Sequence, residues 1–314
     1  MEKSKLIISG SPHVNASIGL RYNMWNVVIA LVPALSVSVY FFGLDSVRVL
    51  SIALASSLLT EFVFLKLRKK TPDLLDGSCV VTALLYALIL PAGLPSWMVA
   101  LGGIFAVVFG KHVFGGLGCN IFNPALIGRA FLVAAYPVAM TAYPPVYNSA
   151  YDAVTSATPL GLAKFSAVVT PVKDLFWGNI SGSLGETCAF ALILGAVYLL
   201  VVGVINIRVS LSIILSYGFL QGAFWLINPG KFYNPLFGIL SGGFLIGALF
   251  MATDPVTSPV TKKGRCFFGI GIGLIVFIIR SFSGLPEGMM YSILIMNSFS
   301  PLINRLTLPR RFGG

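Results

Sequence analysis

Long apolar stretches separated by short polar or basic segments dominate this chain. A stretch of about 20 apolar residues is long enough to cross the hydrocarbon core of a bilayer as a helix. The pattern predicts ten such helices, several of them short or interrupted by Gly and Pro, near residues 24–43, 47–65, 78–94, 97–114, 123–137, 186–204, 209–227, 235–252, 266–283 and 288–304. We therefore expect an all-α integral membrane protein.

The composition agrees with a membrane location. Of the 314 residues, 57% are hydrophobic and only 10% are charged, whereas charged residues make up about 25% of a typical soluble domain. A soluble domain of this length could not bury so much apolar surface, so membrane lipid must cover part of it. The net charge of +11 does not indicate nucleic-acid binding, because the basic residues lie between apolar stretches rather than on one face.

The distribution of basic residues predicts the orientation. With the N-terminus in the cytoplasm, sixteen of the 21 Lys and Arg residues fall on the cytoplasmic side, Lys111 and Arg129 among them, and five, including Arg280, fall on the outer side. Cytoplasmic loops carry the excess of Lys and Arg in membrane proteins. Both termini are therefore expected on the cytoplasmic side of the cell (inner) membrane, which requires an even number of crossings.

Short similarities between the two parts of the chain indicate an internal repeat. Residues 90–95, 103–109 and 122–129 resemble, in the same order, residues 252–257, 271–277 and 299–305. Chance similarity in apolar sequence is the alternative. Two repeats of five helices must have opposite orientations, as in many transporters. The expected organisation is a cytoplasmic segment 1–23, a first repeat 24–137, an outer loop 138–185, a second inverted repeat 186–305 and a cytoplasmic tail 306–314.

Two polar, Gly- or Pro-rich segments, 115–123 and 253–259, interrupt the apolar pattern. Backbone that leaves a helix inside a membrane must be buried in protein or line a wet cavity. Asp254 lies in the second segment, and an acidic residue inside a membrane is a candidate for an ion pathway. Its alternative role is to cap a helix at the cytoplasmic end and to pair with Lys262 or Lys263.

Other candidate residues have ordinary structural explanations. Glu186 opens the sixth apolar stretch, where an acid suits a helix N-terminus, although a place on a cation pathway is the alternative. For His112 we favour a structural role over a proton relay. The four cysteines are far apart, which argues against a disulfide or metal framework, and only Cys119 is kept as a candidate ligand at an interface.

The expected outer loop, residues 138–185, is too long for a simple connection between helices, and such loops are usually functional or disordered. It contains a turn of small residues around 152–161. From the residues alone, Asp152 would cap a helix, and Thr158 with Pro159 would start one.

The same segment carries the pattern D-x-x-(S/T)-(G/S)-A-T, as Asp152, Thr155, Ser156, Ala157 and Thr158. With this pattern, the chain resembles the family of Rnf complex D subunits, which is similar to the B subunit of the sodium-translocating NADH:quinone reductase. The resemblance covers nearly the whole chain and includes the stretches at residues 110–120, 183–187, 251–257 and 287–291.

The resemblance implies a covalent flavin on Thr158. In the family, a flavin transferase uses FAD, and the threonine hydroxyl displaces AMP to give a threonyl ester of FMN. Small neighbours, Ser156 and Ala157, suit entry of an accessible backbone into the transferase, and Asp152 and Thr155 would aid recognition. The tether would keep an electron carrier on the outer face.

The resemblance also implies partners and a second cofactor. The family complex passes electrons between ferredoxin and NAD and couples this to Na⁺ or H⁺ movement, with other subunits carrying iron–sulfur clusters, a second covalent FMN and the NADH site. A noncovalent riboflavin or FMN in the helical bundle is implied as well, and Asn120, Asn123 and Thr253 are its candidate ligands. The transported ion is left open. A channel or secondary transporter of the same fold, without flavin, is the competing hypothesis.

Overall fold

The computed structural model describes residues 19–69, 74–144, 157–166 and 168–308. Their regular structure is helical. No strand occurs among them, and a single isolated bridge pairs Pro91 with Ser183. The predicted all-α class is therefore confirmed for the described residues.

Four helices in the described part of the chain are long and apolar enough to cross a membrane, namely α1 (Leu20–Phe42), α2 (Leu44–Leu67), α10 (Ile207–Ile227) and α13 (Lys262–Phe282). Other apolar helices are α3 (Ser78–Leu88), α4 (Ser96–Val107), α5 (Pro124–Ala135), α9 (Ala189–Val202) and α14 (Met289–Thr307). The remaining elements are short: η1 (Leu74–Asp76), α6 (Pro137–Thr141), α7 (Pro159–Phe165), α8 (Val172–Trp177), α11 (Pro235–Leu240) and α12 (Phe244–Ile246). Two π-helices, η2 (Val108–His112) and η3 (Gly247–Met251), continue α4 and α12.

Each of the ten expected stretches contains helix, but not every stretch is a continuous one. The stretch 235–252 is divided into α11, α12 and η3, because the chain turns at Gly242 with a φ of +63°. Within the stretch 78–94, the helix ends at Leu88. Four helices meet the length and composition of a membrane span, so the count of ten and the inverted repeat remain predictions.

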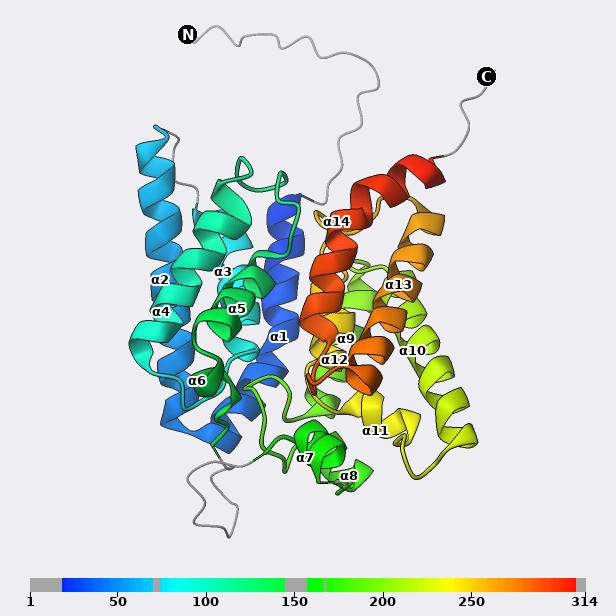
Figure 1. The fold of residues 1–314 in the computed structure, drawn as a ribbon. Helices are drawn as coiled ribbons and strands as arrows, with labels where there is room; N and C mark the ends of the chain where they lie inside the picture. Colours follow the sequence, from blue (N-terminus) through cyan, green and yellow to red (C-terminus); the bar gives the residue numbers. More distant parts are fainter. Residues whose placement is uncertain (1–18, 70–73, 145–156, 167, 309–314) are drawn as a thin grey trace, which may run out of the picture.

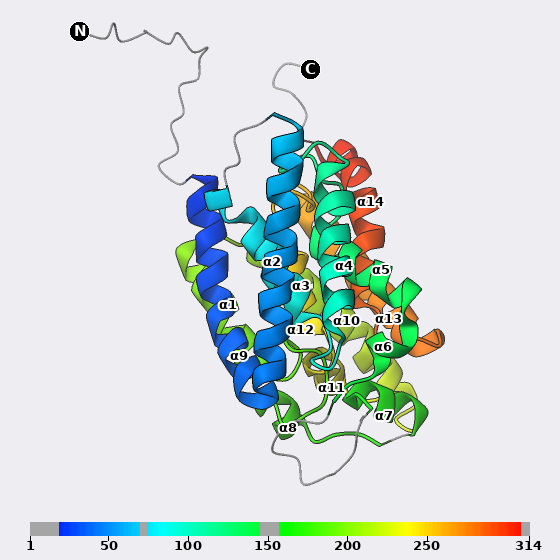
Figure 2. The same ribbon diagram turned by 90° about the vertical axis from the view of Figure 1, so that its left-hand side faces the viewer.

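The helices form two groups that lie side by side (Figure 1). Helices α2, α3 and α4 pack together in one group and α10, α13 and α14 in the other, while α1 against α9 and α5 against α14 join them. A Cβ at Gly195 would collide with the carbonyl of Ala30, so glycine is what allows α9 to approach α1. Figure 2 shows α1 beside α9 from a second direction.

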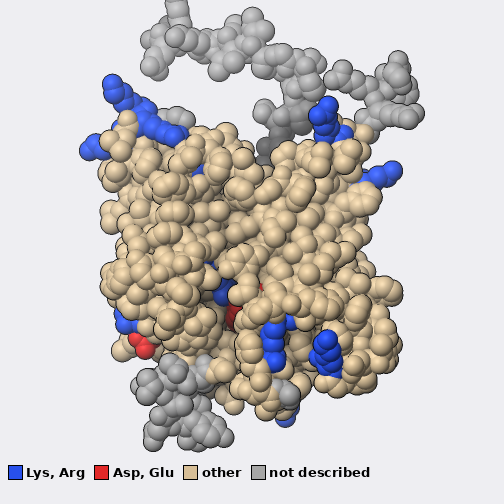
Figure 3. All heavy atoms as spheres, viewed as in Figure 1, with Lys and Arg blue, Asp and Glu red and all other residues tan. Residues whose placement is uncertain are grey.

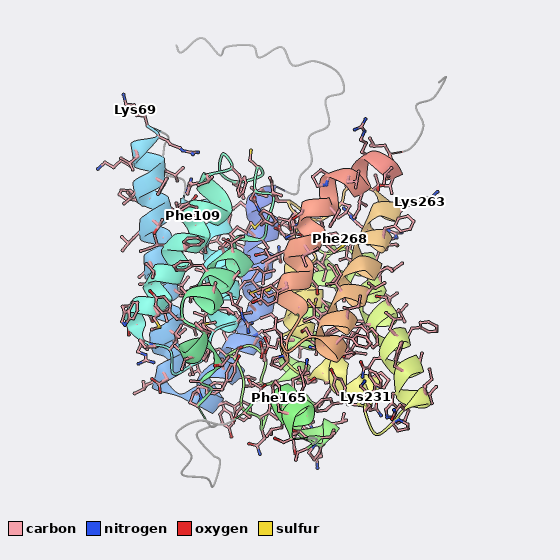
Figure 4. All side chains as sticks on the ribbon, in the orientation of Figure 1. Lys69, Phe109, Phe165, Lys231, Lys263 and Phe268 are labelled. Atoms are coloured by element: carbon pink, nitrogen blue, oxygen red, sulfur yellow. The ribbon has the colours of Figure 1, made fainter. Side chains whose placement is uncertain are left out.

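The two ends of the bundle differ in what they carry. Lys69 and Lys263 lie at the end where α1 begins and α14 finishes, and Phe165 and Lys231 lie at the other end, near α7 and α8 (Figure 4). Most of the blue side chains in Figure 3 lie near these two ends, and a broad, largely uncharged band separates them. The band has the character expected of a lipid-facing surface.

Three basic residues do not lie where the orientation count put them. Lys111, Arg129 and Arg280 are buried, with 3%, 6% and 3% of their surface exposed. Lys111 and Arg129 pair with carboxylates, and Arg280 donates to the Tyr217 hydroxyl and to backbone carbonyls, so these three residues carry no information about sidedness. Without them the count is fourteen against four, so the predicted bias persists.

Candidate functional site

A cavity of about 80 Å³ lies where the two groups of helices meet. Its walls are largely apolar and come from both groups, with Met24 and Val27 of α1, Leu85 of α3, Leu199 of α9 and Phe250 of η3. Both chain breaks that the sequence indicated contribute polar side chains, namely Asn120, Asn123, Thr253 and Asp254, and Ser78, Thr82 and Lys111 add further polar groups. Residues that are far apart in the sequence therefore converge on one site.

Asn123 connects the two breaks. Its side-chain oxygen caps α5 by accepting from the Ala125 N–H at 3.0 Å, and its Nδ2 donates to the Met251 carbonyl at 3.3 Å. Asn120 Nδ2 donates to the Phe122 carbonyl at 3.3 Å, and Thr253 Oγ1 donates to the Leu249 carbonyl at 2.9 Å. The side chains are thus held in place by local backbone groups.

Asp254 does not pair with Lys262 or Lys263, so that part of the sequence interpretation is wrong. Its Oδ1 accepts from the Val256 N–H and its Oδ2 from the Thr257 hydroxyl, both at 3.2 Å. No ion pair to Asp254 occurs within the described ranges, because its own turn satisfies the carboxylate first. The carboxylate is half-buried beside the cavity.

A more polar hollow of about 230 Å³ adjoins the cavity. Val204, Ile205, Thr253 and Pro255 line both spaces. Arg265 also lines the hollow, and its Nε donates to the Pro259 carbonyl at 3.0 Å. An apolar space with amide side chains therefore opens into a polar space with a guanidinium.

Thr158 is the N-cap of α7, at the end of the molecule opposite Lys69 and Lys263. Its Oγ1 accepts from the Gly161 N–H at 3.2 Å, and the residue is 7% exposed. The prediction that Thr158 and Pro159 start a helix is confirmed, and the cap buries the hydroxyl, whereas the resemblance implied an accessible backbone here. Ala157 is exposed, and Asp152, Thr155 and Ser156 lie outside the described residues.

Lys164 fastens α7 to the end of α13. Its ammonium donates to the carbonyls of Arg280, Ser283 and Leu285 at 2.9, 2.5 and 2.7 Å. Partial burial and the nearby charge of Arg280 lower the pKa of Lys164. The carbonyls at the C-terminal end of a helix suit a cation, so this contact fixes where Thr158 stands relative to the second group of helices.

One buried ionic cluster, Glu61 with Lys111 and His112, belongs entirely to the first group of helices. Lys111 Nζ donates to Glu61 Oε1 at 2.8 Å, and His112 Nε2 lies 2.9 Å from Glu61 Oε2. Lys111 also donates to the Ser78 hydroxyl at 2.9 Å, and the imidazole stacks on Phe64. Both carboxylate oxygens are bonded, which agrees with a structural role for His112.

A second cluster joins the two groups of helices. Arg129 of α5 lies with its NH1 3.4 Å from Glu186 Oε1 and its NH2 2.7 Å from Glu287 Oε2. The role of Glu186 as a helix cap is wrong, since α9 begins at Ala189 with Cys188 as its N-cap. Its carboxylate instead points into the protein, where it is 4% exposed.

The sequence interpretation missed both clusters. Lys111 and Arg129 were only counted on the cytoplasmic side and Glu61 was not considered, although charges inside apolar stretches are a functional signal in their own right. Opposite charges in different stretches could have been considered as pairs. Which ones meet follows only from the packing, since Arg129 and Glu287 are separated by 158 positions.

Cys119 is exposed and the described cysteines are free. The described ranges contain no group of three His, Cys, Asp or Glu side chains that could hold a metal ion. The role of Cys119 as an interface ligand stays a prediction.

Comparison with known proteins identifies the family. The model of the NQR2, RnfD, RnfE family matches residues 7–313. The chain belongs to this family. The D subunit of a "Proton-translocating ferredoxin:NAD(+) oxidoreductase complex" from Clostridium ljungdahlii is 41% identical, over 100% of this chain and 98% of the relative. The "Na(+)-translocating" counterpart from Acetobacterium woodii is 43% identical, over 100% and 97%.

A more distant relative, the D subunit of an "Ion-translocating oxidoreductase complex" from Actinobacillus succinogenes, is 35% identical over 98% of this chain and 97% of the relative. The family resemblance inferred from the motifs is thus confirmed over the full length. Together with the four spanning helices, the family assignment makes this a multi-pass membrane protein.

Proposed function

We propose that this chain is the membrane flavoprotein subunit of an ion-translocating ferredoxin:NAD oxidoreductase complex, incomplete as an enzyme on its own. The observation that carries the proposal is the full-length similarity to two D subunits of complexes with that activity in their names. Its partners would be the iron–sulfur, flavin and NADH-binding subunits of such a complex. Its place would be the cell (inner) membrane, with both termini in the cytoplasm and residues 138–185 on the outer face.

The first proposed cofactor is FMN esterified to Thr158 by a flavin transferase. The chemistry of the residue fits the group. Esterification removes the hydroxyl proton but leaves Oγ1 as an acceptor, so the bond from the Gly161 N–H can persist. Since the hydroxyl is buried as a cap, the first turn of α7 must open before a transferase can reach it.

The second proposed cofactor is a noncovalent flavin, riboflavin or FMN, at the cavity between the helix groups. A flavin ring has broad apolar faces and one edge with amide-like donors and acceptors. The apolar walls suit the faces, and the side-chain amides of Asn120 and Asn123 suit that edge. The adjoining hollow, with Arg265, suits the polar chain of the flavin.

Bound flavins supply one- and two-electron chemistry. This chain's residues contribute position. Lys164 holds α7 against α13, and Asn123 ties the two breaks together. Asp254 and the Arg129 cluster place carboxylates near the proposed electron path, where ion movement could be coupled to it.

Detection of covalently bound flavin on the chain tests the proposed function. The chain is produced together with a flavin transferase and separated under denaturing conditions, where only covalent flavin stays fluorescent on the band. We expect fluorescence in the wild type and in Thr158→Ser, and none in Thr158→Ala. A wild-type band without fluorescence contradicts the proposal and leaves a flavin-free channel or transporter.

The second cofactor has a separate test. The flavin released from purified protein by acid is the noncovalent part. Asn123→Ala is expected to lower it at least several-fold while the fluorescence of the denatured band is unchanged. Asn228→Ala is the matched control, because Asn228 is exposed at the C-terminal end of α10. Equal release from both variants would contradict this assignment of the cavity.

A further inference from the structure

The cluster of Arg129, Glu186 and Glu287 has more acid than base. One guanidinium faces two carboxylates, each bound to one of its terminal nitrogens. If all three groups are ionised, their contacts leave one carboxylate charge unpaired, since the neighbouring Arg280 is hydrogen-bonded to Tyr217 and to the carbonyls of Gly238 and Ser241. A charge excess of this kind inside a membrane protein is costly.

Hydrogen bonding in the cluster is also incomplete. Glu186 Oε2 and Glu287 Oε1 are buried, and neither has a hydrogen-bond partner of good geometry among the described residues. The hydroxyl of Ser183 is fully buried beside Glu186 and is placed to donate toward that carboxylate. Buried acceptors without donors are rare in folded proteins. The two carboxylate oxygens therefore indicate that the site takes up a further hydrogen-bond donor.

The backbone around Glu186 is built to keep it there. The Leu184 N–H donates to the Leu90 carbonyl at 3.0 Å and the Gly185 N–H to the Leu88 carbonyl at 2.6 Å, which pins the segment to the end of α3. A Cβ at Gly185 would lie 2.9 Å from the Leu88 Cβ. A Cβ at Gly243 would lie 3.0 Å from Glu186 Oε1. Gly185 thus lets the segment approach α3, and Gly243 leaves space for the carboxylate.

The cluster also lies between the two proposed flavin sites. Toward α7, Leu160 packs on Gly242, which adjoins Gly243 and Glu287. Toward the cavity, Arg129 and Glu287 line a small space with Met251, whose carbonyl accepts from Asn123. A continuous series of contacts therefore leads from the Thr158 helix through the cluster to the cavity.

We propose that the Arg129–Glu186–Glu287 cluster is a proton-binding site in which one proton is held between Glu186 and Glu287. Uptake transfers one proton from hydronium to Glu186 Oε2, so that one O–H bond of hydronium breaks, one forms at the carboxyl, and the unpaired carboxylate charge is cancelled. The protonated carboxyl then donates to Glu287 Oε1, and this one hydrogen bond satisfies both unbonded carboxylate oxygens. A metal cation would need a fuller set of oxygen ligands than these carboxylates provide.

Neighbouring charges set the affinity for that proton. Arg129 favours the ionised carboxylates, and each carboxylate opposes ionisation of the other. The buried Tyr143 interacts electrostatically with both carboxylates, and Arg280 interacts with Glu287. As a coupled pair, Glu186 and Glu287 would take up the proton together rather than as independent groups.

A role of this proton site in coupling rests on the proposed function. The test of proton binding does not depend on that function. The full-length chain is purified in detergent with the subunits that accompany it. Infrared difference spectra are recorded between acidic and alkaline buffer without Na⁺. We expect a band from the C=O stretch of a protonated carboxylic acid, shifted in heavy water, absent in Glu186→Gln and present in Asp45→Asn, the exposed control.

Glu287→Gln serves if Glu186→Gln fails to fold, and it should shift the pH midpoint of the band or remove it. Persistence of an unchanged band in both variants would overturn the proposal. So would loss of the band on adding NaCl, but not choline chloride, at constant pH, since that identifies a sodium site. A missing covalent flavin in the same wild-type sample would contradict the proposed function alone.

Discussion

The two buried ionic clusters of this protein are similar in composition and different in pairing. Glu61 lies between Lys111 and His112, with both oxygens bonded. Glu186 and Glu287 share Arg129, and one oxygen of each is left over. The first cluster lies within one group of helices, and the second joins the two groups. His112 Nδ1 has no partner among the described residues, but the carboxylate of the first cluster is satisfied, and this difference between the carboxylates is why we propose a proton site only at the second cluster.

The largest effect is expected from breaking the complete cluster. Glu61→Gln leaves the Lys111 ammonium buried without its carboxylate, and loss of one partner from a buried pair costs about 3–5 kcal/mol. The free energy of unfolding in mild detergent measures it. The double variant Glu61→Met, Lys111→Met should recover most of the loss, because an apolar pair leaves no charge behind. A cost below about 1 kcal/mol for Glu61→Gln would show that the cluster is not structural.

A smaller loss of stability is expected from a substitution that displaces the segment carrying Glu186. Gly185→Ala would bring a Cβ within 3.0 Å of the Leu88 carbonyl oxygen. Overpacking of this kind costs about 1–3 kcal/mol and should also displace Glu186 from Arg129. Gly284→Ala is the matched control, since a Cβ at that position would have nothing within 4 Å. Equal unfolding free energies for the two variants would refute this account of Gly185.

Removing the excess carboxylate should change stability least among the buried sites. In Glu186→Gln, Arg129 keeps Glu287 at 2.7 Å and loses only the 3.4 Å contact. The free energy of unfolding should change by no more than about 1 kcal/mol in either direction. Ion uptake by vesicles that contain the complex should nevertheless fall at least tenfold relative to electron transfer. Ion uptake equal to that of the wild type would contradict a functional role for the Arg129–Glu186–Glu287 cluster.

The smallest change in the free energy of unfolding is expected at an exposed ion pair. Asp45 and Arg48 form a pair at 3.2 Å, with side chains 60% and 40% exposed. Asp45→Asn should change the free energy of unfolding by no more than about 0.5 kcal/mol, and less at high salt. If this variant cost as much as Glu61→Gln, burial would not be the property that separates these pairs.

The local features of this protein were readable from its sequence. Apolar stretches predicted helices, because the backbone in lipid must satisfy its own hydrogen bonds. Thr158-Pro159 predicted a helix start, and Thr158 is the cap of α7. The fifth apolar stretch was expected from residue 123, and α5 begins at Pro124. The motif around Thr158 carried the family resemblance, which the match over residues 7–313 confirmed.

Long-range partners were not readable in this way. Asn120 and Thr253 were chosen only as polar residues at breaks, and the packing of the helices is what brings both to one cavity. Glu186 seemed a cap because an acid before a helix usually is one. Its partner Arg129 lies 57 positions away, and no local pattern specifies which buried charges will meet.

The sequence by itself therefore determined the helical class, the cap at Thr158, the apolar surface and the family, since each depends on neighbouring residues or on overall composition. Only the tertiary structure decided that Glu61 is fully paired and that Glu186 and Glu287 compete for one arginine. The physical reason is that a charge in a low-dielectric interior is stabilised by the groups within a few ångströms of it, whatever their separation along the chain.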